Sequence, residues 1–244
     1  MALLLLAVGL SAAGSLIGLL LASSFLLIAD RLRARLVSSL LSFAVGTLLG
    51  AALLKLTPEA LVGLPSTHVL GSVLAGIFTF FVLERTVVWR HCHEGEECLV
   101  HSSTAPLLII GDAVHSFVDG AIIAAAVMTS VPLGVSTAAA VIAHEVPQEL
   151  GDFAILLGAG YSRRRALLLN VAAGSAGVAG AVAAYFAASA LPSALPYLLG
   201  FAAGNFLYVA MADLIPNLHR GPLDESPWRQ ALLLAGGVAL LVAL

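Results

Sequence analysis

Long apolar runs fill this sequence almost from end to end, and they constrain its fold more than any other feature. Polar breaks divide the runs into eight stretches, each near the roughly 20 residues that a helix needs to cross a bilayer. The stretches lie near Leu3–Ile28, Leu36–Leu56, His68–Val88, Ala105–Met128, Leu133–Gly158, Ala166–Ala188, Leu195–Ile215 and Trp228–Leu244. Because a backbone in lipid must satisfy its own hydrogen bonds, each stretch is predicted to be helical.

The composition leads to the same fold class. Hydrophobic residues make up 60% of the chain and charged residues only 10%, too few to cover a soluble domain with polar surface. We therefore expect an all-α polytopic bundle of about eight transmembrane helices that forms a single transmembrane domain over residues 1–244. The expected partner is a lipid bilayer, and no basic stretch interleaved with aromatic residues suggests a nucleic acid.

The basic residues predict the topology. They follow the odd-numbered stretches, while the connections after stretches two, four and six contain no Lys or Arg. These basic residues are Arg31, Arg33, Arg35, Arg85, Arg90, Arg163, Arg164, Arg165, Arg220 and Arg229. By the positive-inside rule, both termini lie outside and the odd-numbered helices end in the cytoplasm. We expect a multi-pass protein of the cell (inner) membrane.

Two stretches differ from the others because they contain ionisable residues. The fourth has Asp112, His115, Ser116 and Asp119, and the fifth has His144, Glu145, Gln148, Glu149 and Asp152. Such groups cost about 2.5–3.5 kcal/mol each in a membrane, so they usually face a cavity and have partners. Residues four apart share a helix face, which pairs His115 with Asp119 and His144 with Gln148. Two imidazoles, a carboxylate and an amide oxygen suit Zn²⁺ and related divalent ions.

The neighbouring residues have less certain roles. Glu149 and Asp152 are interpreted as supporting or mouth residues, and Asp112 is either that or a packing residue. Pro147 removes one helix hydrogen bond and frees a carbonyl near Ala143 or His144, which either serves the site or only kinks the helix.

These residues also carry a resemblance to a known family. Gly111-Asp-Ala-Val-His-Ser-Phe-Val-Asp-Gly120 and His144-Glu-Val-Pro-Gln-Glu-Leu-Gly-Asp-Phe153 resemble the ZIP (Zrt/Irt-like) divalent metal transporters. The second stretch is similar to the HExPHExGDF motif found in the fifth helix of one subfamily. Trp89-Arg-His-Cys-His93 and Gly204-Asn-Phe-Leu-Tyr-Val-Ala-Met-Ala-Asp213 also match. The resemblance covers nearly the whole chain.

The resemblance implies that zinc moves into the cytosol through a site between the fourth and fifth helices. Its primary ligands would be His115, Asp119, His144 and Gln148, and an adjacent second site would use Ser116 and Glu145. Ser116 stands where the family usually has Asn, and Gln148 where it has His or Glu. Both are weaker ligands, so a complete two-metal centre is not expected.

A polar segment over residues 89–104 is predicted to be a cytoplasmic loop rich in His, Cys and Glu. Its candidate ligands are His91, Cys92, His93, Glu94, Glu96, Glu97, Cys98 and His101. Their spacing differs from that of a closed structural zinc site. The segment is therefore either a weak, exchanging zinc acceptor or a solvated acidic loop.

The second and seventh stretches repeat one pattern at identical steps. Gly46, Lys55 and Pro58 in one correspond to Gly204, Asp213 and Pro216 in the other. Chance similarity and an inverted repeat of the kind common in transporters both explain the match. We hypothesise that Lys55 and Asp213 neutralise each other or gate the path.

The main hypothesis is a metal-uptake transporter that is not an enzyme. One rival is an intramembrane zinc hydrolase, because His144-Glu145-Val146-Pro147-Gln148 resembles HExxH without its second His. Another is a metal sensor without flux. The sequence does not choose between zinc, cadmium, iron and manganese, although two His ligands favour the softer ions. It also leaves open the coupling mechanism and whether the chain forms a homodimer.

Overall fold

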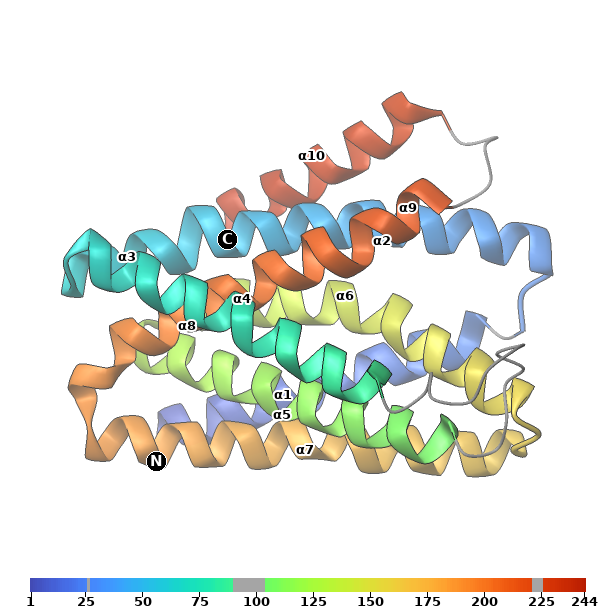
Figure 1. Cartoon of the computed structure of the whole chain (residues 1–244), viewed down its shortest axis with the longest axis horizontal. Coiled ribbons are helices and arrows are strands. Elements are labelled where there is room, and N and C mark those ends of the chain that lie inside the picture. Colours follow the sequence, from blue (N-terminus) through green and yellow to red (C-terminus); the bar gives the residue numbers. More distant parts are fainter. Residues whose placement is uncertain (26, 90–103, 221–225) are drawn as a thin grey trace.

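The chain folds into a bundle of helices that run along the long axis of the molecule (Figure 1). The structure is a computed structural model that describes residues 1–25, 27–89, 104–220 and 226–244. No strand occurs in these ranges. The α-helices are α1 (Ala2–Phe25), α2 (Asp30–Gly50), α3 (Thr57–Gly63), α4 (Ser66–Trp89), α5 (Thr104–Thr129), α6 (Val131–Gly158), α7 (Arg163–Ala190), α8 (Leu195–Tyr208), α9 (Ile215–Arg220) and α10 (Pro227–Ala243).

Within the described ranges these helices form eight rods. A π-helical segment, Ala51–Leu56, joins α2 to α3, and a second one, Val209–Leu214, joins α8 to α9. Six rods are long and apolar enough to cross a membrane. Of the other two, α6 is interrupted by carboxylates and α10 has only 17 residues. The prediction of an all-α polytopic membrane bundle is confirmed, and the chain is a multi-pass integral membrane protein.

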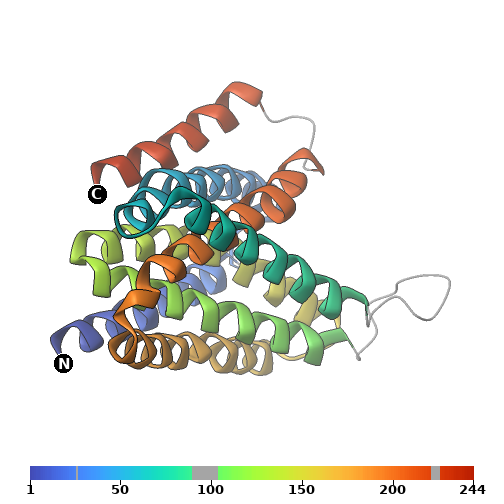
Figure 2. The same cartoon turned by 60° about the vertical axis from the view of Figure 1, so that its left-hand side comes forward.

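The two termini lie at the same end of the bundle (Figures 1 and 2). This follows from an even number of rods. Which side of the membrane this end faces stays a prediction of the positive-inside rule. The predicted loop ligands of residues 90–103 lie outside the described residues, so their role in zinc binding also stays a prediction.

Local sequence signals set the ends of α6, the helix that carries His144. Ser130 caps its N-terminus by accepting a hydrogen bond from the Leu133 amide at 3.3 Å, and Pro132 follows in the first turn, where a missing N–H costs nothing. At the other end Gly160 adopts a φ of +86°, a left-handed conformation that glycine tolerates best. The chain then reverses direction into α7.

Helices α5 and α7 approach each other until their backbones touch. A methyl group added at Gly180 would lie 1.8 Å from the Phe117 carbonyl oxygen, and one at Gly120 would lie 1.8 Å from that of Gly177. Only glycine fits such contacts, and small residues commonly permit this packing in membranes. Gly177 and Gly180 therefore form a close packing face of α7. It fixes the position of α5, which carries His115.

The sequence pattern shared by the second and seventh rods has a structural counterpart. Both rods contain a π-helical segment, and each segment lies at the same offset from the matched Gly46 and Gly204. No ion pair joins Lys55 to Asp213 in the described part of the chain, so their role in gating the path stays a prediction. Asp213 Oδ1 instead accepts a hydrogen bond from Asn217 at 3.0 Å. The rods run in opposite directions (Figure 1), so equivalent positions fall toward opposite ends of the bundle.

Candidate metal site

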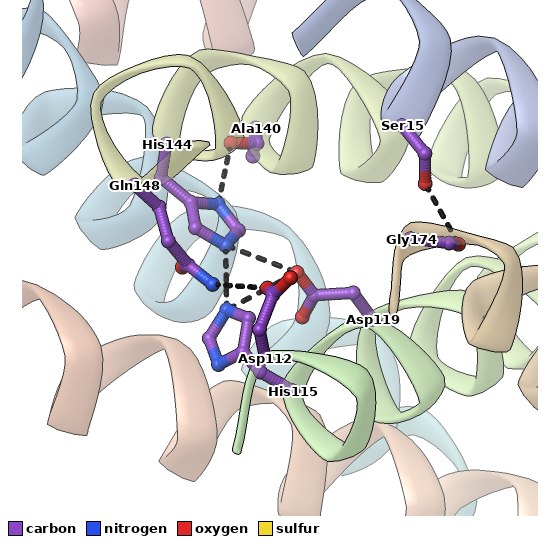
Figure 3. A network of polar contacts seen from close by, with 8 residues as sticks. All are labelled: Ser15, Asp112, His115, Asp119, Ala140, His144, Gln148 and Gly174. Atoms are coloured by element: carbon purple, nitrogen blue, oxygen red, sulfur yellow. Dashed lines mark hydrogen bonds and ion pairs between the residues drawn. The ribbon is translucent and has the colours of Figure 1, made fainter. Parts of the chain in front are cut away.

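Three of the predicted ligands converge between α5 and α6 (Figure 3). His144 Nε2 lies 3.0 Å from Asp119 Oδ2 and 3.2 Å from His115 Nε2. His115 Nε2 lies 3.5 Å from the same Asp119 oxygen. Since His115 and Asp119 are one turn apart on α5, this helix alone positions two of the three ligands.

A hydrogen bond to the backbone fixes the orientation of His144. Its Nδ1 lies 3.1 Å from the Ala140 carbonyl oxygen, which can only accept a hydrogen bond. Nδ1 is therefore the donor, and in the neutral imidazole the lone pair is on Nε2. This lone pair points at the lone pairs of Asp119, which repel it unless a proton or a metal ion lies between them. Backbone bonds of this kind also orient metal-bound histidines.

The spacing of the three atoms suits a tetrahedral metal ion. Ligands about 2.0–2.1 Å from Zn²⁺ are separated from one another by about 3.3 Å in a tetrahedron. The observed separations of 3.0, 3.2 and 3.5 Å are close to this value. Small adjustments of the side chains can therefore place one ion in contact with all three.

Aromatic rings and burial shield this group, which we call the metal cluster (His115, Asp119 and His144). The side chains of Asp119 and His144 are almost fully buried, and that of His115 is 14% exposed. The Phe80 ring lies edge-on to His115 and the Phe206 ring to His144, each with centroids 6.1 Å apart. Among the described residues the cluster is exposed on the His115 side, where an ion can enter or leave.

Gln148, the fourth predicted primary ligand, has a different partner. Its Nε2 donates a hydrogen bond to Asp112 Oδ1 at 3.1 Å, which ties α6 to α5 one turn away from the metal cluster (Figure 3). The structure thus brings together three of the four predicted residues and places the fourth beside them. Asp112, whose role was open from the sequence, is the partner of Gln148.

A cavity of about 280 Å³ reaches the metal cluster from one end of the bundle. Its lining comes from the last turns of α4, the first half of α5, the second half of α6 and the junction of α8 with its π-helical segment. Polar lining residues are Glu84, Asp112, His115, Gln148, Asp152, Tyr208 and Asp213. This end of the bundle is the one where α4 ends and α5 begins, which the basic residues predict to be cytoplasmic.

Toward the opposite end, apolar side chains fill the space. Ile123 and Val127 of α5, Val141 of α6 and Leu199 of α8 are almost fully buried, and they belong to one hydrophobic core. The metal cluster therefore lies at the boundary between an open polar half and a sealed apolar half of the molecule.

The predicted second-site residues lie outside the metal cluster. Ser116 is buried beside α7, where its carbonyl oxygen would be 3.2 Å from a methyl group at Gly177. The Glu145 side chain lies on the face of α6 that packs against α1. A methyl group added at Gly18 of α1 would lie 3.2 Å from Glu145 Cβ. Ser116 Oγ and Glu145 Oε2 are buried without hydrogen-bond partners among the described residues.

The two supporting acids have different locations. Asp152 lines the cavity, as expected for a mouth residue, whereas Glu149 lies in a second pocket on the other side of α6. The sequence analysis missed Glu84 and Tyr208, which also line the cavity and are joined by a hydrogen bond from Tyr208 Oη to Glu84 Oε2 at 2.6 Å. Tyr208 lies in the Gly204–Asp213 stretch that carried the resemblance, so this stretch could have identified it as a candidate site residue.

Comparisons with known proteins identify the family of the chain. Residues 89–244, more than half of the chain, match the family model described as ZIP Zinc transporter. The chain is similar to the zinc transporter ZIP13 of Pongo abelii, with 34% identity over 224 residues that cover 84% of this chain and 66% of the relative. It is 30% identical to the zinc transporter YKE4 of Saccharomyces cerevisiae over 228 residues, which cover 81% of this chain and 66% of that protein.

Human zinc transporter ZIP4 is 42% identical over 142 residues, which are 57% of this chain and 22% of the relative. The chain thus spans about two thirds of the length of two of these relatives and about a fifth of the third. Taken with the family model and the motifs of α5 and α6, these matches establish that the chain belongs to the ZIP zinc transporter family.

Proposed function

We propose that this protein transports zinc across the membrane into the cytosol through His115, Asp119 and His144. The observation that carries the proposal is the convergence of two imidazole nitrogens and one carboxylate oxygen at the inner end of the cavity. Nitrogen and carboxylate ligands in tetrahedral spacing favour zinc over hard cations such as magnesium. Relatives named as zinc transporters support the same substrate.

Three protein ligands leave the fourth position of a tetrahedral ion open to water. Gln148 and Asp112 lie next along the cavity and are the natural acceptors of a hydrated ion that leaves the metal cluster. The predicted orientation makes this cavity the cytosolic exit. Iron and manganese are weaker candidates because they bind such a site less tightly than zinc does, whereas cadmium, a softer ion, also suits imidazole ligands.

A zinc hydrolase that uses His144 and Glu145 is the alternative. Such an enzyme needs its general base beside the metal-bound water. Glu145 starts on the face of α6 toward α1, and it is absent from the described residues that line the cavity. The arrangement therefore favours transport.

The experiment is ⁶⁵Zn uptake into proteoliposomes that contain the purified protein. Saturable uptake that is lost in His144→Ala supports the proposal. Ser189→Ala serves as the control, since Ser189 lies on the exposed surface of α7 with its hydroxyl bonded to the Tyr185 carbonyl. Stoichiometric zinc binding without uptake would instead identify a sensor, and turnover of a peptide substrate would identify a hydrolase.

A further inference from the structure

A second pocket lies on the other side of α6, between α1, α6 and α7. It has a volume of about 160 Å³, and its polar lining residues are Ser15, Glu149, Asn170 and Ser175. Ser175 is exposed, whereas Ser15 is half-buried and Glu149 and Asn170 are buried, so these three are the groups considered as ligands. We call this space the lateral pocket. It shares no lining residue with the cavity that reaches the metal cluster.

Buried polar atoms in the lateral pocket lack partners. Asn170 is completely buried, and neither atom of its amide has a hydrogen-bond partner among the described residues. Glu149 is 1% exposed, and its Oε2 atom is likewise without a partner. Because unpaired buried polar groups are costly, their presence in a space large enough for several water-sized particles indicates a ligand.

The pocket holds one carboxylate and no compensating charge. Glu149 is the only acid among the described lining residues, and no basic side chain forms an ion pair with it in the described ranges. A charge buried in lipid is retained only when it is paired. A bound cation would supply the missing positive charge.

Two of the proposed ligand oxygen atoms, Ser15 Oγ and Glu149 Oε1, lie near Gly174. Ser15 Oγ donates a hydrogen bond to the Gly174 carbonyl at 3.1 Å. A methyl group at Gly174 would lie 3.4 Å from Ser15 Oγ and 4.0 Å from Glu149 Oε1. The absence of a side chain at this position keeps open the space between the hydroxyl and the carboxylate.

We propose that the lateral pocket binds a monovalent alkali cation through Glu149, Asn170 Oδ1 and Ser15 Oγ. All three ligands are oxygen atoms, which suit hard cations and lack the nitrogen that zinc prefers. One carboxylate neutralises one positive charge, whereas a divalent ion would leave a net charge in the membrane. The pocket has room for the ion and for water that completes its coordination.

This inference does not depend on zinc transport, and its test contains no zinc. The melting temperature of the purified full-length protein is measured in detergent while NaCl replaces choline chloride at constant ionic strength. The wild type should become more stable in a saturable manner, because a ligand that binds only the folded state stabilises it. Binding of ²²Na⁺ to the same protein should saturate near one ion per chain.

Glu149→Gln keeps the shape of the side chain and removes its charge, so the apparent Na⁺ affinity should fall at least about tenfold. The control Ser189→Ala should respond like the wild type. Gly174→Ala is the second variant, since it keeps every proposed ligand side chain while its methyl group enters the space beside Ser15 Oγ and presses on Ser15 Cβ at 3.2 Å. It should also lose the Na⁺ response, and it decides the matter if Glu149→Gln fails to fold.

The proposal would be overturned if both variants kept the Na⁺-dependent rise in melting temperature. It would also be overturned if the melting temperature of the wild type were the same in NaCl as in choline chloride. Saturable stabilisation by Mg²⁺ or Ca²⁺ with none by Na⁺ would overturn the assignment of a monovalent ion.

Discussion

Two adjacent faces of α6 have opposite chemistry. One face carries His144 and Gln148 and points to α5 and to the cavity, where imidazole nitrogen is available to a metal ion. The next face, one residue further along the helix, carries Glu145 and Glu149 and points to α1 and α7, where all the ligands are oxygen. A rotation of about 100° per residue separates the two environments.

This difference teaches that the cluster of acids in α6 is not one site. The family resemblance places Glu145 in a second site adjacent to the zinc ligands. In the structure Gln148 and Asp152 line the cavity, Glu149 lines the lateral pocket, and Glu145 lines neither. The two faces should therefore respond differently to substitution, and the following predictions test this.

The largest effect is expected for Asp119→Asn. The change replaces the only carboxylate of the metal cluster with a neutral amide of the same size. Loss of an outer partner of a metal ligand typically costs about 10–100-fold in affinity, so loss of the ligand charge should cost more than about 100-fold. Zinc titration of the purified protein by calorimetry measures this. If the zinc affinity of Asp119→Asn stayed within a few-fold of the wild type, Asp119 would not be a zinc ligand.

Gly180→Ala should act through the position of α5. The added methyl group would meet the Phe117 carbonyl at 1.8 Å and force α5 away from α7. Overpacking of this kind costs about 1–3 kcal/mol of the free energy of unfolding, which thermal or denaturant unfolding in detergent can measure. Gly71→Ala is the matched control, since it has open space and should be neutral or slightly stabilising. Equal stability of the two variants would contradict the packing argument.

Acid should weaken zinc binding at the imidazole face. Both histidines must be neutral to bind zinc, and an ordinary histidine has a pKa of about 6.5. Affinity should therefore be at least about tenfold lower at pH 5.5 than at pH 7.5. Calorimetry at the two pH values provides the comparison, and His68→Ala, at an exposed site away from the metal cluster, should keep the wild-type difference. A pH-independent affinity would argue against imidazole ligands.

The smallest effect on zinc is expected for Glu145→Gln. Because Glu145 lies toward α1 and outside the metal cluster, its neutralisation should change zinc affinity less than about threefold, through long-range electrostatics alone. The same titration used for Asp119→Asn measures it. If Glu145→Gln lost as much zinc affinity as Asp119→Asn, Glu145 would be a direct zinc ligand, and the two faces of α6 would not differ in this respect.

Much of the fold could be predicted from the sequence because lipid allows few solutions. Apolar length defined the eight rods, and the i, i+4 rule placed His115 with Asp119 on a single face. The pairing of α5 with α6 followed from the cost of isolated charges in a membrane.

The remaining details depend on packing between helices that periodicity does not encode. The partner of Gln148 is Asp112, 36 residues away, and nothing in the spacing selects it over the metal cluster. The lateral pocket requires α1 and α7 to meet α6, and no rule of sequence spacing places Ser15 and Asn170 beside Glu149. Lys55 and Asp213 were assigned to each other because they matched in sequence, but antiparallel rods put matched positions at opposite ends.

The backbone contact between α5 and α7 limits how the protein can move. Each glycine rests against a carbonyl of the other helix at Gly120–Gly177 and at Gly180–Phe117, so neither helix can slide or roll without a steric clash. A displacement of α5 must therefore carry α7 with it as one rigid body. Opening of the sealed half to the other side of the membrane then requires α6 and α8 to move against this pair. A cross-link that joins α5 to α7 should be harmless, whereas one that joins α5 to α6 should trap a single state.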